Sequence, residues 1–393
     1  MTIKFKCYIK FALLLLAGSF ITNIALGASL TYDKGILFNY GPDIFTMKLN
    51  GYIMGDATKF SSDPDLLISG ANLRYARLSL SGNMFRDWAY ALSYSLSSSA
   101  LKNVNISYQG WHNMYLKLGQ FLPDFTLANW ASNTNINFLE IGLPSDAFEP
   151  PYSRGASYGI YNKVFSAKVS VFSGSINESY QGREPLGGTI RLIYSPIHTA
   201  TRDVHLAISN WLQRPDGSDS ATFGTIPEAN SRKDDQLLNT GTINNIRYYN
   251  ATDFEAAGVY GPWSAQAEFV VNQVKRKNAT PNLFFSGYYL TTSYFLTGES
   301  RAYSFPGCGF AGISPIHHKK YGAWQVLGRI SRLNLNDRMI QGGQETNVTA
   351  GLNWYVNTVV ALKFNIIRAF ARPAFNGRNV NTTIYAARIQ LQA

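Results

Sequence analysis

The feature that most constrains this chain is a strict alternation of apolar and polar residues in long segments. In the segment 346–355 (TNVTAGLNWY), Val348 and Leu352 fall on one face, while Asn347 and Asn353 fall on the other. Successive side chains of a β-strand point to opposite faces, so period-two alternation predicts strands rather than helices. The segment 384–393 alternates in the same way.

The length of these segments and the position of their aromatic residues indicate a membrane barrel. Strands of soluble sandwiches average about five or six residues, whereas several segments here reach nine or ten, and aromatic pairs such as Trp354-Tyr355 and Tyr288-Tyr289 often close them. Runs of about ten residues that are apolar outside and polar inside, with aromatic girdles, are typical of outer-membrane barrels. A soluble all-β repeat protein such as a propeller is the alternative, but no fixed period of about 40 residues is visible.

The predicted fold is therefore all-β, a transmembrane antiparallel β-barrel of about 16 strands. Beyond residue 30, no apolar run approaches the ~20 residues that a spanning helix needs. An even strand number in this range is typical of porins. The predicted strands are 45–56, 73–82, 88–97, 103–109, 114–121, 155–162, 166–175, 188–195, 203–212, 253–260, 264–273, 287–297, 321–333, 345–355, 360–370 and 383–392.

The start of the chain predicts export. A lysine-containing beginning, a short apolar run at 11–20 and small residues up to Ala28 are typical of a secretory signal peptide rather than an anchor. We expect residues 1–27 to be this signal peptide and residues 28–393 to form a single barrel domain. The predicted location is the outer membrane of a Gram-negative bacterium.

Removal of the signal peptide leaves Cys308 as the one cysteine of the mature chain. A single cysteine forms no internal disulfide, and it excludes a cysteine-rich zinc site. An exported chain of this size needs another source of stability, and a closed hydrogen-bonded barrel supplies it.

Three predicted connections are long, namely 122–154, 213–252 and 298–320, and their Pro, Gly, Asn, Asp and Ser content is typical of surface loops. The first differs in being rich in aromatic residues, so we expect this third loop to fold into the lumen and narrow it. The constriction residues would be Phe125, Trp130 and Phe138. These rings, with Tyr152, either pack the loop against the wall or form an apolar slide for sugars.

Placing apolar residues outward gives the expected lumen its charge. The acids that then face inward are Glu255 and Glu268. A Lys or Arg on the lipid face would cost ~2–4 kcal/mol at the membrane midplane, which favours the inward assignment. A positive pore concentrates anions, so anion preference is expected; the alternative is that the cations are scattered and functionally neutral. The inward cations are Arg77, Lys117, Lys168, Arg191, Arg329, Lys363 and Arg388.

The sequence gives little support for catalysis, cofactors or nucleic acid. His205 and Ser209 share a strand face but lie about 13 Å apart at ~3.3 Å per residue, too far for proton transfer. Phosphate-cradling glycine motifs are missing, and the formal charge of +11 is better explained by a basic lumen and by loops exposed to lipopolysaccharide. We therefore expect no enzyme activity, cofactor, metal site or nucleic-acid partner.

Several motifs resemble those of the phosphate-selective porin O and P family of Gram-negative outer membranes. The TGESR and GLNWYxN blocks are specific when they occur together. The resemblance implies a sixteen-stranded trimeric porin whose third loop folds inward, with an anion site at an arginine- and lysine-lined constriction. The matching segments are 74–88 (RYARLSLSGNMFRDW), 116–127 (LKLGQFLPDFTL), 287–303 (GYYLTTSYFLTGESRAY), 322–324 (GAW), 331–337 (SRLNLND) and 351–357 (GLNWYVN).

Residue by residue, the resemblance carries over only part of that anion site. Phosphate-specific members have two adjacent arginines at the start of the second strand; here Arg74 is retained and Tyr75 replaces the other. A family acid before the fourth strand becomes Lys102. In the third loop, a family serine matches Ser132. A family Lys, Ser and Arg align with Asn129, Asn133 and Ile141.

A phosphate site loses affinity when cationic donors become amides or alkyl groups. The function expected is therefore a passive channel for small anions and other small hydrophilic solutes, with phosphate specificity left open. The alternatives are a general or sugar-permeable porin and a non-conducting structural or adhesive barrel. Expected partners are the solutes, outer-membrane lipid and lipopolysaccharide, and two further copies of the chain in a homotrimer. The candidate pore and anion-binding residues are Arg74, Tyr75, Arg77, Lys102, Lys117, Ser132, Arg191, Arg329, Lys363 and Arg388.

Overall fold

The structure is a computed structural model that describes residues 28–32, 35–41, 43–62, 67–180, 182–229, 236–313 and 320–393. The predicted signal peptide, residues 1–27, lies outside the described residues.

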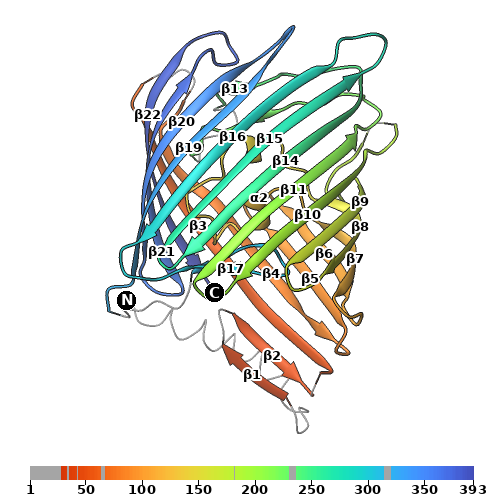
Figure 1. Cartoon of the computed structure of the whole chain (residues 1–393), viewed down its shortest axis with the longest axis vertical. Helices are drawn as coiled ribbons and strands as arrows, with labels where there is room; N and C mark the ends of the chain where they lie inside the picture. Colours follow the sequence, from red (N-terminus) through yellow and green to blue (C-terminus); the bar gives the residue numbers. More distant parts are fainter. Residues whose placement is uncertain are drawn as a thin grey trace, which may run out of the picture.

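Sixteen antiparallel strands close into a tilted barrel (Figure 1). The main sheet has 18 strands, of which β1 and β2 lie outside the barrel wall, leaving 18 − 2 = 16. Each wall strand pairs with its neighbours along the chain, and the last strand closes the ring by pairing with the first, from Gln392 opposite Tyr52 to Ile384 opposite Phe60. The wall strands are β3 (Phe45–Phe60), β4 (Gly70–Met84), β5 (Trp88–Ser95), β6 (Ala100–Tyr108), β7 (Met114–Phe121), β8 (Ser153–Tyr161), β9 (Phe165–Ser173), β10 (Leu186–His198), β11 (Arg202–Arg214), β14 (Ile246–Tyr260), β15 (Trp263–Arg276), β16 (Leu283–Phe295), β19 (Ala323–Asp337), β20 (Ile340–Tyr355), β21 (Val360–Ala371) and β22 (Val380–Gln392).

The prediction of sixteen strands is confirmed, and the alternation that led to it is also found. Ile330, Val348 and Ile366 are exposed on the outside, where the membrane lies, while Asn347 and Asn353 are fully buried on the inside. Aromatic residues gather on the outer face where the strands meet their short turns. This girdle contains Phe85, Trp88, Trp111, Phe165, Tyr194, Tyr260, Trp263, Tyr294 and Tyr321.

A hairpin that the sequence analysis did not predict extends one strand beyond the wall. β1 (Ala28–Tyr32) pairs with β2 (Ile36–Tyr40), and β2 pairs with the first residues of β3, from Phe45 to Leu49. That part of β3 lies beyond the reach of β22, so β2 satisfies an edge that would otherwise be unpaired. The hairpin projects from the barrel end that carries the C-terminus (Figure 1).

Short turns join the strands at the end that carries the C-terminus, except for the connection after β16, and most of the longer loops lie at the other end. Barrels of this kind place short turns in the periplasm and long loops outside the cell. None of the helices in the described part of the chain has the length and apolar character to cross a membrane.

Two of the three long connections were wrongly predicted to be surface loops. The connection after β16 (residues 296–322) lies at the short-turn end, and its hairpin of β17 (Arg301–Ser304) and β18 (Gly309–Ile313) lies inside the barrel, where Arg301, Gly309 and Phe310 are buried. The connection after β11 (residues 215–245) contains β12 (Gly224–Thr225) and β13 (Leu238–Asn239), which contact the third loop and β20. Both segments carry apolar side chains that are buried inside the lumen, such as Phe310 and Leu238. Burial of these side chains favours the inward course of the segments.

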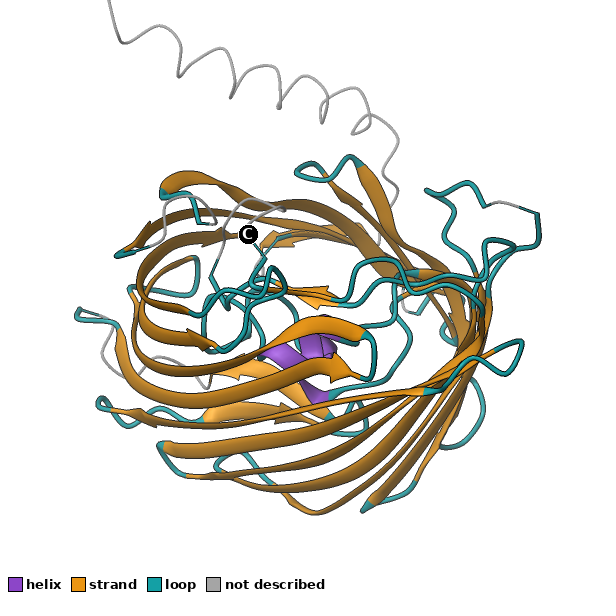
Figure 2. Cartoon of the chain, turned by 90° about the horizontal axis from the view of Figure 1, so that it is seen from above, coloured by secondary structure: helices purple, strands orange, loops and turns teal. Residues whose placement is uncertain are grey.

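The expectation for the third loop, residues 122–152 and here called L3, agrees with the structure. L3 contains the short helices α2 (Leu127–Trp130) and α3 (Leu143–Ala147), and the view from above shows them within the ring of strands (Figure 2). Thr126 caps α2 by accepting a hydrogen bond from the Asn129 backbone at 3.2 Å, and Pro144 opens α3.

Candidate functional site

The lumen contains a cavity of ≈ 790 Å³ between L3 and one part of the barrel wall. The wall side is built from inward-facing residues of β3 to β7. The cavity reaches the C-terminal Ala393 at the short-turn end and Glu149 of L3 further up. It is the candidate solute path.

The opposite side of the lumen is filled by apolar packing. Side chains of L3 and of the 215–245 connection meet inward-facing residues of β9, β11, β14, β15, β16 and β19. Inward residues on these strands are apolar because they contact the inserted loops rather than water. The path is thereby confined to the β3–β7 side. The cluster includes Phe125, Leu143, Phe148, Phe172, Trp211, Phe223, Leu238, Ile246, Val270, Phe285 and Leu333.

A network of buried ion pairs attaches L3 to the wall at Glu140. The Arg74 guanidinium donates to both Glu140 carboxylate oxygens at 2.8 and 2.9 Å. Arg388 donates to both Asp56 oxygens at 2.7 Å and to Glu140 at 2.9 Å. Burial alone would raise the pKa of Glu140, but Arg74 and Arg388 lower it, so the carboxylate stays charged.

A β-bulge explains how Arg74 and Tyr75, which are adjacent, both contact Glu140. Met54 of β3 pairs with Tyr75, but the next residue, Gly55, pairs with Leu73, so Arg74 is the extra residue. A bulge re-aims a side chain, and here the Tyr75 hydroxyl also donates to Glu140 at 3.2 Å. Arg74, expected as an anion-binding residue, is therefore engaged in holding L3.

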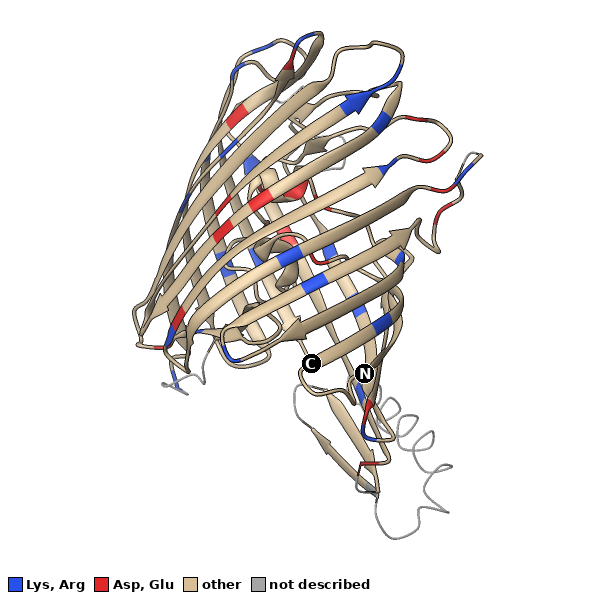
Figure 3. Cartoon of the chain, turned by 45° about the vertical axis from the view of Figure 1, so that its right-hand side comes forward, with Lys and Arg blue, Asp and Glu red and all other residues tan. Residues whose placement is uncertain are grey.

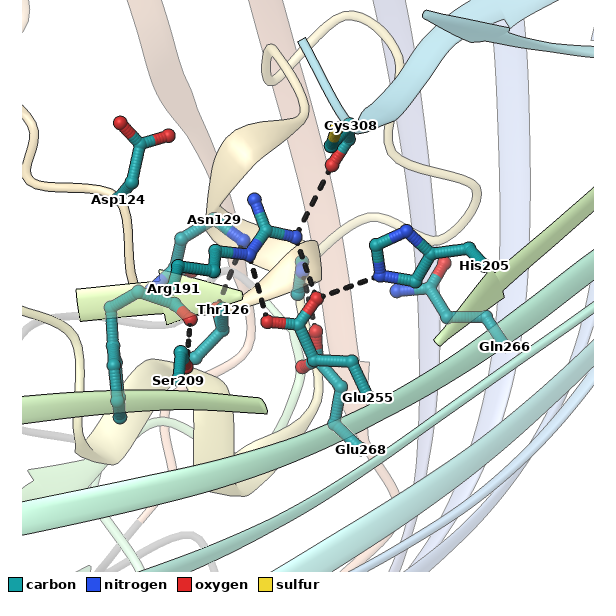
Figure 4. A network of polar contacts seen from close by, with 12 residues as sticks. Asp124, Thr126, Asn129, Arg191, His205, Ser209, Glu255, Gln266, Glu268 and Cys308 are labelled. Atoms are coloured by element: carbon teal, nitrogen blue, oxygen red, sulfur yellow. Dashed lines mark hydrogen bonds and ion pairs between the residues drawn. The ribbon is translucent and has the colours of Figure 1, made fainter. Parts of the chain in front are cut away.

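A second network joins β10, β11 and β14 to the loops (Figure 4). Arg191 donates to both oxygens of Glu255 at 2.9 and 2.6 Å and to the Cys308 carbonyl at 3.2 Å. His205 contacts Glu255 at 3.0 Å and the Tyr303 hydroxyl at 2.7 Å. The expected absence of a Ser–His pair agrees with this geometry, since the Ser209 hydroxyl donates to the Phe125 carbonyl instead.

Three further inward cations expected from the sequence also hold loops. Lys168 pairs with Asp124 at 3.2 Å and donates to the Gly307 carbonyl at 2.7 Å. Arg329 pairs with Glu228 at 2.8 Å, and Lys363 donates to the Ile136 carbonyl at 2.6 Å. These cations are therefore engaged by fixed protein groups.

The sequence analysis counted too few inward acids. Asp56, Asp203, Asp253 and Glu345 are also buried on the inner face, and L3 adds Asp124, Glu140, Asp146 and Glu149. Both signs of charge occur at mid-height on the strands (Figure 3). The electrostatics of the path consequently depend on the cations that no carboxylate neutralises.

Three such cations lie at or beside the cavity, with aromatic rings as their neighbours. Arg77 lies 5.7 Å from the Tyr52 ring and 5.9 Å from the Tyr152 ring, and it donates to the Tyr152 hydroxyl at 3.4 Å. Lys117 lies 5.6 Å from the Phe121 ring, and Lys102 lies 5.2 Å from that of Tyr152. Across the described ranges, none of the three forms an ion pair within 4.0 Å. Arg77 and Lys117 line the cavity, whereas Lys102 lies behind Tyr152.

The third-loop positions that correspond to the family anion site also line this cavity. Asn129, Ser132, Asn133 and Ile141 all face it. Asn129 donates to the Ser145 carbonyl at 3.4 Å, and Asn133 donates to the Tyr52 hydroxyl at 3.2 Å. The Ser132 and Thr134 hydroxyls lie 3.1 Å apart. These side chains offer neutral donors to a passing solute.

One acid of L3 titrates near neutral pH. Glu149 is accessible from the lumen but surrounded by protein, and this burial, with the nearby Asp146 carboxylate, raises the pKa of Glu149 to about 8. Arg77 and Lys102 are close enough to oppose that rise. Below this pKa the carboxyl is neutral, so the three cations act without a counter-charge from Glu149.

Raising the pH from about 6 to about 9.5 is therefore expected to reduce anion preference, because Glu149 loses its proton beside Arg77 and Lys102. The measurement is the zero-current potential in a salt gradient at a series of pH values. Glu149→Gln should remove most of the change between pH 7 and 9. An unaltered pH profile in this variant would contradict the assignment.

Phe125 and Phe138 of L3 pack the loop against the wall, whereas Trp130 and Tyr152 line the cavity. Phe125 is buried against Trp211, with ring centroids 5.9 Å apart, and Phe138 is buried under Arg329 at 4.3 Å. Trp130 borders the cavity, but its ring also lies against Gly307 and Gly309 of the inserted hairpin.

Gly309→Val is expected to change the bore, because a Cβ at Gly309 would lie 2.1 Å from the rigid Trp130 ring. The ring must then move toward the cavity or pull α2 away from the hairpin. We expect a clear change in single-channel conductance while the barrel still assembles. Gly70→Val is the matched control, since a Cβ there meets nothing within 4 Å and the backbone φ is not positive. Unchanged conductance in Gly309→Val would contradict the packing role of Trp130.

One group of acids has the spacing of a cation site. In the described part of the chain, oxygens of Asp253, Glu255 and Glu268 lie within 4.8 Å of one another. Two of the three are already engaged, since Arg191 and His205 contact Glu255. Glu268 accepts hydrogen bonds from the Ala128 backbone at 2.8 Å and the Ser145 hydroxyl at 2.7 Å. We therefore assign Glu255 and Glu268 to the attachment of the inserted segments.

The comparisons with known proteins agree with this architecture. The family model for phosphate-selective porin O and P matches residues 47–392. The chain belongs to this family. It is an outer-membrane porin and not an enzyme. Porin O of Pseudomonas aeruginosa is 24% identical over 378 residues, covering 83% of each chain.

Solved structures share the fold of this porin. The anion-selective porin from Comamonas acidovorans has a TM-score of 0.56 at 11% identity, covering 89% of this chain and 100% of that one. OmpT of Vibrio cholerae in its trimer form has a TM-score of 0.55 at 9% identity, again covering 89% and 100%. At these identities the likeness concerns the barrel alone.

Proposed function

We propose that this porin is a passive channel for small anions and other small hydrophilic solutes, with a preference for anions. The observation that carries the proposal is the group of unpaired cations at the cavity, Arg77, Lys117 and Lys102. The other inward cations predicted from the sequence are held by carboxylates or carbonyls, so these three contribute most of the unpaired charge among the predicted residues. In a water-filled bore with low-dielectric walls, such a group concentrates anions.

We further propose that the channel does not select phosphate over chloride. Tight phosphate recognition uses several cationic donors placed together. Here Arg74 is occupied by Glu140, and Asn129, Asn133 and Ile141 stand where the resemblance places a Lys, a Ser and an Arg. An anion then meets Arg77 and Lys117 with neutral neighbours, which favours fast passage over retention.

Solute block of single channels tests this proposal. We expect millimolar phosphate or pyrophosphate to leave most of the chloride conductance intact, and maltodextrins to produce no long closures. Strong block at micromolar phosphate would show a selective phosphate site, and strong maltodextrin block would favour the sugar-permeable alternative. The absence of any conductance from correctly folded protein would favour the non-conducting barrel.

We also propose that the porin assembles as a homotrimer, as the family resemblance implies. The trimer form of OmpT, which has the same barrel fold, supports this proposal. Chemical cross-linking in mild detergent should give products that contain up to three chains and no more. A limit at one chain would overturn the trimer and leave the proposed conduction path unaffected.

A further inference from the structure

The outer face of the barrel carries a group of arginines that the lumen does not explain. Arg332 of β19 and Arg368 of β21 lie at outward positions, and Arg372 follows directly after β21; all three are exposed. Arg332 pairs across the sheet with Thr346, and Thr346 pairs with Phe370, so these residues form one row on the outer surface.

The nearest partners of these arginines are uncharged. Arg368 donates to the Thr383 hydroxyl at 2.8 Å, and Arg372 donates from two nitrogens to the Asn381 side-chain oxygen at 3.3 and 3.2 Å. Both guanidiniums lie over the Phe370 ring, at 5.3 and 5.5 Å. Across the described residues, none of the three arginines forms an ion pair within 4.0 Å.

The outward positions around the arginines also carry no acid. On β19 to β22 the outward residues of the described wall are apolar, small, amide or hydroxyl side chains, apart from Arg332 and Arg368. Lys59, outward on the adjacent β3 and opposite Tyr385, adds a further positive charge. Among the residues that the structure describes, the patch therefore has an excess of positive charge.

A hollow lies between the arginines. It has a volume of ≈ 270 Å³ and is lined by Arg332, Gln344, Thr346, Phe370 and Arg372. Two guanidiniums thus face one small space, each with planar donors suited to two oxygens of one phosphate group.

The position of the hollow decides what can fill it. Ile330, Val348 and Ile366 lie next to it on the outer surface, toward the middle of the strands, and they are exposed to lipid. The arginines lie at the strand ends that carry the long loops, which face the outside of the cell. This is the level of the headgroups of the outer leaflet, and basic pockets at headgroup level bind anionic lipid headgroups.

We propose that Arg332, Arg368 and Arg372 form a binding site for the phosphate groups of an outer-leaflet glycolipid of the lipid A class. The guanidiniums of Arg332 and Arg372 hold a phosphate in the hollow, Arg368 adds charge from the side of β22, and the acyl chains lie along the apolar band formed by Ile330, Val348 and Ile366. The site lies outside the barrel and is independent of the conduction path.

Native mass spectrometry of the full-length porin in detergent tests this site. We expect the protein to retain added bisphosphorylated lipid A, and the variant Arg332→Gln/Arg368→Gln/Arg372→Gln to retain about tenfold less. Dephosphorylated lipid A should bind the parent protein and the variant equally weakly. Single-channel conductance should be the same in both proteins, since these residues lie outside the lumen.

The matched control removes three basic side chains from the opposite end of the barrel. Arg86, Lys163 and Arg202 are exposed at the short turns, and Arg202 lies over the Tyr260 ring at 5.1 Å much as Arg368 lies over Phe370. Arg86→Gln/Lys163→Gln/Arg202→Gln should leave lipid A binding unchanged. An equal loss in this control would show nonspecific attraction and overturn the proposal.

A competition experiment with inorganic phosphate distinguishes a lipid site from a site for free phosphate. Excess inorganic phosphate should leave bisphosphorylated lipid A bound, because it lacks the apolar contacts. Displacement by inorganic phosphate at equal concentration would overturn the lipid assignment. Arg332→Gln alone should already weaken binding, which keeps the test valid if the triple variant does not assemble. Undiminished binding in both variants would also reject the site.

Discussion

Replacing Arg77 and Lys117 together by glutamine is expected to remove most of the anion preference. An ion that passes about 4 Å from a fixed charge gains about 1 kcal/mol at the dielectric constant of water, and about 4 kcal/mol at an effective value of 20. Since 1.4 kcal/mol corresponds to about a factor of ten, the value in water gives a fall of about fivefold in the chloride-to-potassium permeability ratio, and a lower effective dielectric constant gives a larger fall. Zero-current potentials in a potassium chloride gradient measure this ratio directly.

The control for this double variant is Arg202→Gln. It removes one exposed cation at the short-turn end of the barrel and should leave the permeability ratio unchanged. Arg77→Glu with Lys117→Glu should go further and produce cation preference. If the glutamine variant kept the ratio of the parent protein, the selectivity would have to reside elsewhere in the lumen. The paired cations at Arg191 and Arg388 would then be the first candidates.

Glu140→Gln is expected to loosen L3 and destabilise the barrel. The Glu140 carboxylate holds two guanidiniums and a tyrosine hydroxyl, and its removal leaves Arg74 without an acidic partner in a largely buried place. Breaking a buried ion pair by removing one partner costs about 3–5 kcal/mol. We expect a lower midpoint in heat-modifiable electrophoretic mobility, and noisier single channels of altered conductance.

Glu345→Gln provides the matched comparison. Glu345 is a fully buried acid on β20, and neither of its carboxylate oxygens has a hydrogen-bond partner among the described residues. Neutralising it should leave stability unchanged or improve it slightly, because no pair is broken. If the two variants lost equal stability, the loss would reflect the removal of any lumen acid rather than the attachment of L3.

The architecture of the wall could be predicted because alternation is a local property of the sequence. All sixteen wall strands were located, since each needs only an apolar outer face and a polar inner face. The inward course of L3 followed from its aromatic residues. The hairpin of β1 and β2 was not predicted because its five-residue strands are too short to give a periodic signal.

The details of the site were harder to predict because they depend on contacts between distant residues. The pairing of Arg388 with Asp56 spans the whole chain, and only closure of the barrel brings the two together. Asp56 lay at the end of a predicted strand, and the alternation continued through Thr58 would have placed it inside. The bulge at Arg74 has no local signature, so the engagement of Arg74 by Glu140 could not be derived from the sequence.

The inserted segments were the other source of error. Inward residues such as Val270, Phe285 and Leu333 are apolar because loops cover them. The alternation of apolar and polar residues on β15, β16 and β19 is therefore less regular. Polar composition alone assigned residues 298–320 to the surface. Their buried Phe310 and Cys308 show that such a segment can turn inward when its few apolar residues find a partner such as α2.

The most direct test of the central claim is the zero-current potential of the purified mature porin in a planar bilayer under a tenfold potassium chloride gradient. The account predicts an open channel whose potential has the sign of chloride preference. A potential of the opposite sign, or a folded barrel that passes no current, would contradict it.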